Sequence, residues 1–257
     1  MTRSGTPLSI DGHARYDVAA ELGINVQDDK NYLALRDAYA DLPPDPYAPG
    51  SGRYRRYARG MFLPWSKEFL WMPATESQLR NGMHGYYQGD HNPEYVGVVR
   101  DLPAISDFVC RNQLLLDMIQ FDFDQTRWDE NDSVWPLFVG VHLIKLHIEE
   151  AGREAVSSPN ELHQDGEPFV FAHLVYRTNA EGGGNLIAPP KYRGKQPEDV
   201  PQQDRLSEFD LENPLESYAV TDHLVSHYVG PIHKGDDDGP GERAIVLTDW
   251  VPMRHRI

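Results

Sequence analysis

A histidine and an aspartate stand one residue apart in the run His163-Gln164-Asp165-Gly166, and another histidine, His227, lies further along the chain. In an extended segment, residues i and i+2 project from the same face, so His163 and Asp165 can reach one metal ion together. Two histidines and one carboxylate form the facial ligand set of non-haem Fe(II) oxygenases. The residue types and their spacing therefore indicate an Fe(II) site of this kind.

Arg243 opens a late apolar strand, residues 243–248, and adds a second element of the same chemistry. Three protein ligands on one face of an octahedral metal leave three adjacent positions, enough for a chelating 2-oxoacid and dioxygen. A guanidinium on a strand can neutralise the far carboxylate of such an acid in a bidentate pair. Arg243 is therefore a candidate for binding a 2-oxoacid co-substrate.

Three neighbouring histidines compete for the third ligand position: His223, His227 and His233. His223 and His227 share strand parity, so geometry alone permits either. His233 lies in a predicted turn beside a run of aspartates, where an exposed polar residue is the simpler interpretation. We interpret His173, within the apolar run 169–176, as a strand residue and not as a ligand.

The segment that carries the His-Gln-Asp-Gly run resembles a known family. Residues 158–187, which include this run and a later triple glycine, are similar to the bacterial 2-oxoglutarate/Fe(II) dioxygenases that hydroxylate free amino acids, the L-isoleucine dioxygenase group. Residues 224–232 resemble the strand that bears the distal histidine of that family, and residues 241–248 resemble its arginine strand. The similarity covers roughly residues 40–250.

The resemblance implies roles for four residues by position. His163, Asp165 and His227 would hold Fe(II), and Arg243 would bind 2-oxoglutarate. It further implies O2 as co-substrate, ascorbate as an auxiliary reductant, and hydroxylation of a free L-amino acid at an aliphatic carbon with succinate and CO2 as co-products. Two alternatives remain open: a cupin-like metalloenzyme that does not use 2-oxoglutarate, and a non-catalytic jelly roll that binds a metabolite.

Three further residues are candidates for binding the substrate: His142, Lys145 and Arg177. The apolar alternation in 135–148 changes phase near position 144, which indicates a bulge or a strand covered on both faces. This strand runs towards the metal segment, so its polar residues could line the site. The alternative for each is an ordinary satisfied or solvent-facing strand residue.

The remaining patterns predict a mainly β protein with flanking helices. We expect helices at 28–42 and 104–124, where apolar residues recur at helical spacing. Two strands joined by a turn are expected within 54–72, and a metal-binding β core at about 135–250. Composition does not distinguish a double-stranded β-helix, the jelly roll of cupin-like proteins, from another β-sandwich. The family resemblance favours the jelly roll.

Two loops and one end of the chain also carry expectations. Residues 1–12 are polar and are expected to be flexible. Residues 189–205, rich in proline, glutamine and aspartate, form a long loop and a candidate lid. By comparison with the family it resembles, the acidic, glycine-rich segment 233–241 is long, and we expect it to border the mouth of the site.

Composition limits the location and the partners. The formal net charge of −16 argues against nucleic acid and against an anionic membrane surface. Cys110 is the one cysteine, so no internal disulfide can form. We see no secretory signal and no membrane-spanning segment. One domain, 1–257, in a cytoplasmic enzyme is the expectation, with a small-molecule substrate and an oligomeric state that is open to a homo-oligomer.

Overall fold

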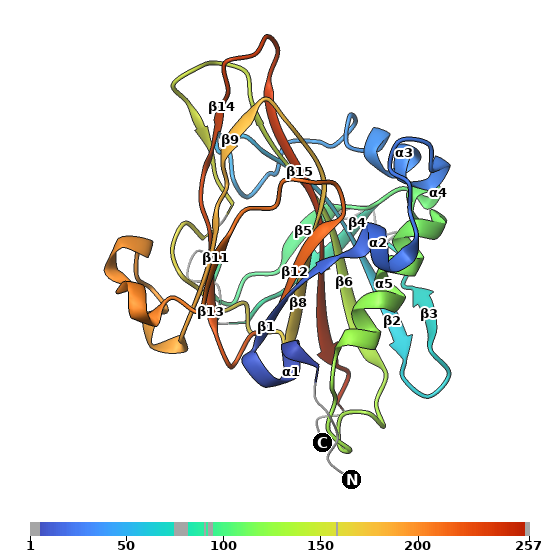
Figure 1. Ribbon diagram of the computed structural model, residues 1–257. Helices are drawn as coiled ribbons and strands as arrows, with labels where there is room; N and C mark the ends of the chain where they lie inside the picture. Colours follow the sequence, from blue (N-terminus) through green and yellow to red (C-terminus); the bar gives the residue numbers. More distant parts are fainter. Residues whose placement is uncertain (1–5, 75–81, 90, 92–94, 158, 255–257) are drawn as a thin grey trace.

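The computed structural model describes residues 6–74, 82–89, 91, 95–157 and 159–254. Within this part of the chain, seven strands form one large sheet in the order β1-β12-β8-β15-β6-β2-β3 (Figure 1). Their bounds are β1 (His13–Asp17), β2 (Arg53–Leu63), β3 (Glu68–Trp71), β6 (Leu137–Ile148), β8 (Phe169–Thr178), β12 (Glu216–Thr221) and β15 (Gly241–Pro252). The sheet therefore combines strands from both ends of the sequence.

Smaller sheets lie on one side of this large sheet, and the helices α3, α4 and α5 lie on the other (Figure 1). The three-stranded sheets have the orders β11-β10-β13 and β7-β14-β9, and β4 pairs with β5. Their bounds are β4 (Met83–Tyr86), β5 (Arg100–Pro103), β7 (Glu154–Ala155), β9 (Ala180–Gly182), β10 (Asn185–Ala188), β11 (Ser207–Phe209), β13 (Ser226–Val229) and β14 (Ile232–Lys234). The fold is the predicted jelly roll, mainly β with flanking helices.

Strand β6 is buried on both faces. Val139, Val141 and Leu143 pack in the core beneath the helices, whereas Ile144 contacts the core between the sheets. Its pairing with β15 and β2 is continuous, so the phase change in the sequence marks a doubly covered strand and not a bulge. The register shift lies instead between β15 and β8, next to Ala244.

Both predicted helical regions are helical, with different bounds. Residues 28–42 give the short helix α3 (Lys30–Asp37), which the Asp29 side chain caps by accepting a hydrogen bond from the Tyr32 N–H. Residues 104–124 give two helices, α4 (Asp107–Cys110) and α5 (Gln113–Gln125). Asn112 separates them, because its side chain caps α5 and its backbone is extended.

The N-terminal segment differs from the expectation of flexibility. Residues 1–5 lie outside the described part, but residues 7–11 form helix α1 (Pro7–Asp11), followed by β1 and by α2 (Val18–Leu22). Leu8 is fully buried, and its carbonyl accepts a hydrogen bond from the Thr221 hydroxyl. Burial of Leu8 and the pairing of β1 with β12 hold this polar segment against the large sheet.

The predicted hairpin within 54–72 is present as β2 and β3. The 189–205 segment forms three 3-10 helices, η1 (Pro190–Tyr192), η2 (Pro197–Asp199) and η3 (Gln202–Asp204). Backbone hydrogen bonds join Leu162 to Lys195 and to Gly194, so this segment is attached beside the predicted metal ligand at position 163.

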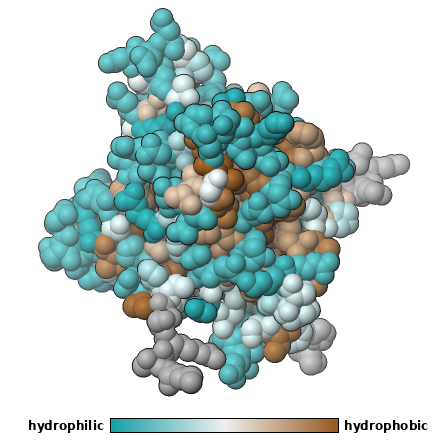
Figure 2. Space-filling view, turned by 45° about the vertical axis from the view of Figure 1, so that its right-hand side comes forward, coloured by the Kyte–Doolittle hydropathy of each residue, from teal (hydrophilic) through white to brown (hydrophobic). Residues whose placement is uncertain are grey.

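The molecular surface is mainly hydrophilic on the face shown in Figure 2, with hydrophobic side chains gathered near its centre. This face brings forward the side of the molecule that carries the helices, where Phe108 of α4 is 68% exposed. Among the described helices, none combines the length and the apolar character needed to cross a membrane.

A buried polar cluster joins helix α5 to the large sheet. The ring of His173 on β8 contacts the Asp122 carboxylate of α5 through Nε2 at 3.1 Å, and its Nδ1 lies 2.7 Å from the Ser217 hydroxyl. The Thr248 hydroxyl donates to the same carboxylate at 2.7 Å. Histidine and aspartate are both fully buried, so the arrangement is structural and offers no access to a substrate.

We predict that His173→Leu lowers the free energy of unfolding by about 3–5 kcal/mol, because it leaves the Asp122 carboxylate buried without its histidine. Urea denaturation followed by circular dichroism measures the loss. The double variant Asp122→Leu/His173→Leu should lose less than the single one, since no buried charge then remains. A single variant as stable as the wild type would show that the cluster contributes little.

Candidate active site

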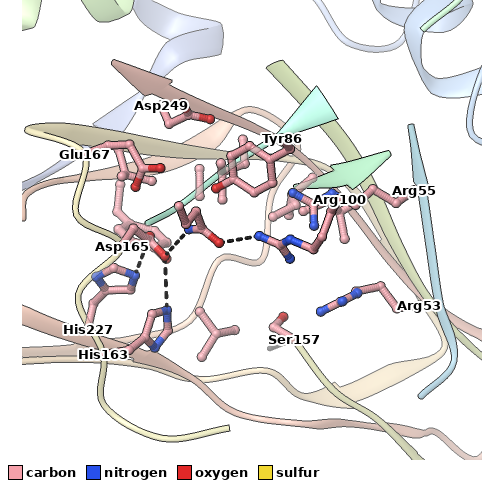
Figure 3. A pocket seen from close by; sticks show the side chains of 18 of the residues that line it. Arg53, Arg55, Tyr86, Arg100, Ser157, His163, Asp165, Glu167, His227 and Asp249 are labelled. Carbon is pink, nitrogen blue, oxygen red and sulfur yellow. Dashed lines mark hydrogen bonds and ion pairs between the residues drawn. The ribbon is translucent and has the colours of Figure 1, made fainter. Parts of the chain in front are cut away.

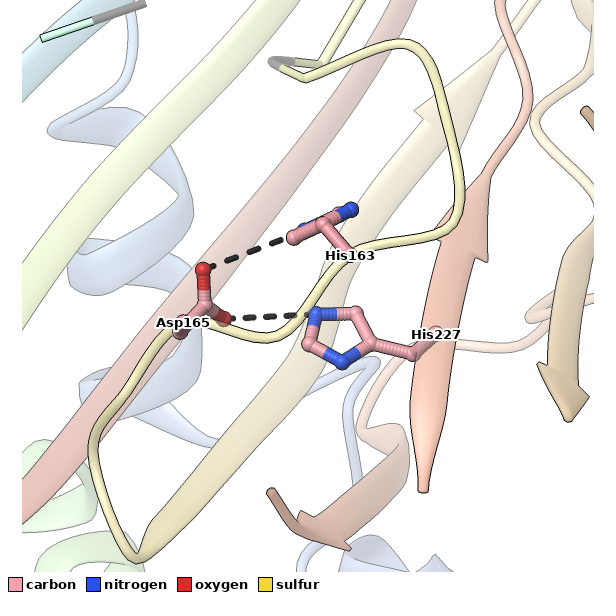
Figure 4. Close-up of side chains that lie close together, drawn as sticks. All are labelled: His163, Asp165 and His227. Atoms are coloured by element: carbon pink, nitrogen blue, oxygen red, sulfur yellow. Dashed lines mark ion pairs between the residues drawn. The ribbon is translucent and has the colours of Figure 1, made fainter. Parts of the chain in front are cut away.

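Three predicted ligand residues lie together between the large sheet and the small ones. One ligand atom from each of His163, Asp165 and His227 lies within 4.8 Å of the other two (Figure 4). The Asp165 carboxylate is 3.2 Å from Nε2 of His227 and 3.8 Å from Nε2 of His163. Two imidazole nitrogens and a carboxylate oxygen converge here, which is the donor set that Fe(II) oxygenases use.

The backbones of the two histidines are bonded directly to each other. The His163 N–H donates to the His227 carbonyl and the His227 N–H donates to the His163 carbonyl, each at 2.9 Å. His227 is part of β13, whereas His163 lies in the segment that leads into β8. This isolated bridge therefore brings two segments that are distant in the sequence to one place.

The imidazole of His163 is held in the form that a metal needs. Its Nδ1 lies 2.8 Å from the Glu161 carbonyl, which only an N–H can satisfy, so Nε2 keeps its lone pair. Burial, with the charge of His227, lowers the pKa of His163 to about 4. The ring is therefore neutral at pH 7 and able to coordinate.

The other two residues influence each other. Burial alone would raise the pKa of Asp165, but the hydrogen bond and the charge of His227 bring the pKa well below its usual range. Burial lowers the pKa of His227, yet the hydrogen bond and charge of Asp165 with the charge of Asp222 produce a net rise. Nδ1 of His227 has no hydrogen-bond partner among the described residues. The carboxylate thus stays ionised and available to a cation.

Asp222, which the sequence did not indicate, holds the turn that carries Asp165. Its two carboxylate oxygens accept hydrogen bonds from the backbone N–H groups of Asp165 and Gly166, at 2.9 and 2.8 Å. Gly166 has φ of 92°, a conformation that glycine adopts without strain, and this turns both N–H groups towards Asp222. Burial and the charge of Asp165 raise the pKa of Asp222 to about 6.

The triad opens into a cavity of about 810 Å³, part of which is open to solvent. Apolar side chains of the large sheet form its floor: Ile144, Val170, Ala172, Ile245 and Leu247. Charged and polar residues surround it, among them Arg53, Arg55, Tyr86, Gln88, Arg100, Glu167, Tyr218, Arg243 and Asp249 (Figure 3). The cavity can therefore bind a molecule with both apolar and ionised parts.

Arg243 projects into this cavity from β15. Its side chain is 3% exposed, its Nε has no hydrogen-bond partner, and no carboxylate among the described residues forms an ion pair with it. Burial, with the charge of Arg177, lowers the pKa of Arg243 to about 10, so the group remains charged at pH 7. A buried cation without a counter-ion is costly, and an anionic ligand would compensate it.

The structure places the three substrate-binding candidates outside the cavity lining. His142 is fully buried behind the lining, with its ring bonded to Arg55 (2.6 Å) and Asp249 (2.7 Å). Lys145 points to the opposite face of the sheet, where Nζ lies 3.3 Å from Glu242. Lys145 has the opposite strand parity to Ile144, which lines the cavity, so the two side chains lie on different faces of β6.

Arg177 is also directed away from the cavity. Its Nε donates to the Ala180 carbonyl and its Nη2 to the Gly182 carbonyl, both at 2.8 Å, so it holds the β8–β9 turn. The other histidines are separate from the triad as well: His223 and His233 are exposed. His227 is the histidine of the three that meets Asp165.

The acidic, glycine-rich loop does not border the cavity. Its part between β14 and β15 is bonded to the Asn179 side chain, which donates to the carbonyls of Asp237 and Gly239. No residue of 233–241 is among those that line the cavity in the described part of the chain. The expected role at the mouth of the site is therefore wrong, because β14 carries the loop towards the β8–β9 turn.

Several lining residues were missed by the sequence analysis. Arg53 and Arg55 alternate on β2 and so share the inward face, a signal that strand parity could have revealed. Arg100, Glu167 and Asp249 show no comparable signal, since nothing in their local sequence distinguishes them from solvated charges. Burial, with the charge of Asp165, raises the pKa of Asp249 to about 7.

The model of a protein family described as 2OG-Fe dioxygenase matches residues 36–249. The chain belongs to this family. This dioxygenase is 28% identical over 223 residues to the 3(1)-hydroxy-L-isoleucine 4-dioxygenase of Pantoea ananatis, covering 84% of this chain and 79% of the relative. It is 30% identical over 214 residues to the L-isoleucine-4-hydroxylase of Bacillus thuringiensis, covering 81% and 80% of the two chains.

Solved structures share the fold. The crystal structure of IDO from Bacillus thuringiensis superposes with a TM-score of 0.69 at 20% identity, over 96% of both chains. A BsmA homologue from Methylobium petroleophilum gives a TM-score of 0.73 at 17% identity, over 97% of this dioxygenase and 92% of the other chain. These similarities confirm the jelly roll.

Family membership decides between the alternatives that the sequence left open. A cupin-like metalloenzyme without 2-oxoglutarate and a non-catalytic binding protein both give way to a dioxygenase that uses Fe(II), 2-oxoglutarate and O2. The residues present fit these groups, because the triad offers the donor set for Fe(II) and Arg243 offers a buried cation that forms no ion pair with any described residue.

We predict that Asp222→Asn weakens metal binding by about 10- to 100-fold, the range typical of residues that orient a ligand. An amide has one acceptor oxygen, so one of the two backbone N–H groups near Asp165 would face an N–H donor. Titration with Fe(II) under anaerobic conditions measures the affinity. The control is His223→Ala, a change at the exposed residue next to Asp222, and this variant should bind metal like the wild type. If Asp222→Asn and His223→Ala bind Fe(II) equally well, Asp222 does not orient the metal ligand.

Proposed function

We propose that this dioxygenase hydroxylates an aliphatic carbon of a free L-amino acid. Fe(II), when bound, supplies the oxidising chemistry that inserts one atom of O2 into a C–H bond while 2-oxoglutarate is cleaved to succinate and CO2. The metal ligands in this proposal are His163, Asp165 and His227. Arg243 binds the distal carboxylate of 2-oxoglutarate.

One observation carries the proposal: the converging triad and the uncompensated Arg243 share a single cavity with an apolar floor. The protein's part is to position the reactants, because the oxidant attacks the C–H bond that lies nearest. Ile144, Ile245 and Leu247 offer a surface for an aliphatic side chain. The names of the relatives, an L-isoleucine-4-hydroxylase and a 3(1)-hydroxy-L-isoleucine 4-dioxygenase, support an aliphatic amino acid.

The proposal includes a cellular setting. A cytoplasmic location fits a chain with one cysteine, Cys110, which cannot form an internal disulfide. A reduced compartment also keeps iron in the Fe(II) state, and ascorbate would serve as the auxiliary reductant in an assay.

We predict that free leucine, isoleucine, valine or methionine is hydroxylated better than its N-acetyl or amide form. The cavity is expected to pair its polar groups with both ionised groups of an amino acid. When one of those groups is blocked, the corresponding polar groups of the cavity stay buried without a partner, which weakens binding. The assay contains purified enzyme, Fe(II), ascorbate and 2-oxoglutarate, and follows succinate and the mass gain of one oxygen. Charged and very large side chains should react less well.

Variants of the triad serve as controls in the same assay. His163→Ala, Asp165→Ala and His227→Ala should each give no product, because two remaining ligands hold Fe(II) poorly, whereas His223→Ala should react like the wild type. Hydroxylation of peptides or N-blocked amino acids, with none of the free acids, would refute the substrate class and leave the dioxygenase activity intact.

We predict that Arg243→Ala raises the KM for 2-oxoglutarate far more than the KM for the amino acid. Removing one partner of a buried charge pair costs about 2–5 kcal/mol, which corresponds to roughly 30-fold or more in affinity. Steady-state kinetics with each substrate varied in turn measures the two constants. Arg243→Lys should restore part of the affinity, and an unchanged KM for 2-oxoglutarate would exclude this role.

A further inference from the structure

A second group of arginines lies in the cavity, apart from Arg243. Arg53 and Arg55 come from β2 and Arg100 comes from β5, and each is at most 6% exposed. Figure 3 shows their side chains on the side of the cavity that faces away from the triad. We call these three residues the arginine cluster.

The positive charge of the arginine cluster is only partly compensated. Asp45 forms an ion pair with Arg53 at 2.8 Å and a weaker one with Arg55 at 4.0 Å. It is the one carboxylate that forms an ion pair with the cluster in the part of the chain that the structure describes. Arg100 instead lies over the rings of Tyr86 (4.6 Å) and Tyr95 (4.5 Å). In the described part of the chain, the three buried cations therefore have one carboxylate in ion-pair contact.

Each arginine of the cluster also retains a donor without a partner. Within the described residues, Nη2 of Arg53, Nε of Arg55 and Nε of Arg100 are buried and make no hydrogen bond. Burial, together with the charges of the other two arginines, lowers the pKa of Arg55 to about 10. Buried charges without partners destabilise a fold, and an anionic ligand would offset that cost.

The arginine cluster and Arg243 are anchored on different strands. Arg53 on β2 and Arg243 on β15 are both paired with Leu146 of β6, so they occupy the same face of the sheet with one strand between them. Two strand spacings amount to about 10 Å. A 2-oxoglutarate that chelates the metal has one carboxylate left, and its single charge is smaller than the combined charge of Arg243 and the arginine cluster.

The cluster is connected to the metal-binding side chains through one amide. Gln88 donates from Nε2 to Oδ1 of Asp165 at 3.3 Å, and its Oε1 accepts a hydrogen bond from Nη2 of Arg100 (Figure 3). An anion held by the cluster therefore lies beside the reaction centre and not at a remote surface. This is where the organic substrate has to be anchored for one of its C–H bonds to face the metal.

We propose that Arg53, Arg55 and Arg100 bind the α-carboxylate of the organic substrate, with Arg100 as the principal contact. The inference rests on the proposed function, since it names the groups by which the site recognises an amino acid. Among the described residues, no carboxylate forms an ion pair with Arg100, whereas Asp45 already neutralises part of the charge of the other two. Glu167 and Asp249 line the same cavity and offer carboxyl oxygens to the ammonium group of an amino acid.

The test pairs an arginine variant with a substrate that lacks the carboxylate. Arg100→Met keeps apolar contact with the tyrosine rings but removes the charge. For the free amino acid that the wild type hydroxylates fastest, the variant should raise KM by about 30-fold or more. For the corresponding carboxamide, KM should change less than about threefold, because no carboxylate is lost. KM for 2-oxoglutarate should also stay within about threefold.

A binding measurement without turnover supports the kinetics. Under anaerobic conditions, with Fe(II) and 2-oxoglutarate present, calorimetry should show tight binding of the amino acid to the wild type and weak binding to Arg100→Met. Arg100→Lys should recover part of the affinity. The matched control is Arg56→Met on the same strand, since Arg56 points to the helical side and donates to the Ala104 carbonyl; its affinities should equal those of the wild type.

Three outcomes would overturn the inference. Weakened 2-oxoglutarate binding with unchanged amino-acid binding would assign the cluster to the co-substrate. Equal losses for acid and carboxamide would make the cluster structural. If the wild type accepts no free amino acid, the proposed function fails. The subsite is then tested separately with 4-methylvalerate, a carboxylate without an amino group.

If the wild type binds 4-methylvalerate and Arg100→Met does not, the carboxylate subsite is still supported. If the wild type does not bind 4-methylvalerate, the subsite is refuted.

Discussion

The site depends on one short contact between two backbones. The reciprocal hydrogen bonds of His163 and His227 join the segment before β8 to β13, so the two imidazoles approach each other without long, flexible side chains. Asp222 then holds the turn after His163 through two further backbone N–H groups. Three ligand atoms are thereby positioned by main-chain geometry, which is more rigid than side-chain rotamers.

The jelly roll remains stable with charged groups in its cavity because its large sheet is packed on both sides. One core lies between the sheet and the helices, and a second lies between the sheet and the small sheets. Apolar burial of this extent offsets the cost of keeping several charged groups in the cavity. Those groups are preorganised for ionised reactants, so little rearrangement is needed when reactants bind.

The charges of the cavity divide into regions that suit different partners. Arg243 stands on β15, the arginine cluster begins on β2, and Glu167 and Asp249 lie nearer to the triad. Two organic reactants, 2-oxoglutarate and the substrate, must bind next to one metal. Each needs its own charged residues, because otherwise the two reactants would compete for the same position. A large sheet provides this separation, since neighbouring strands lie about 4.8 Å apart and inward residues repeat along each strand.

The sequence by itself determined the ligand pattern and the fold class. His163 and Asp165 could be identified because their spacing matches strand geometry, and His227 and Arg243 because their segments resemble a known family. His142, Lys145 and Arg177 lie outside the cavity lining, which the sequence could not show, since a strand that is buried on both faces gives no hydrophobic contrast between them. Asp222 and Arg100 act through contacts with residues far away in the chain. Only the tertiary structure could decide their positions, because local spacing contains no information about which segments meet.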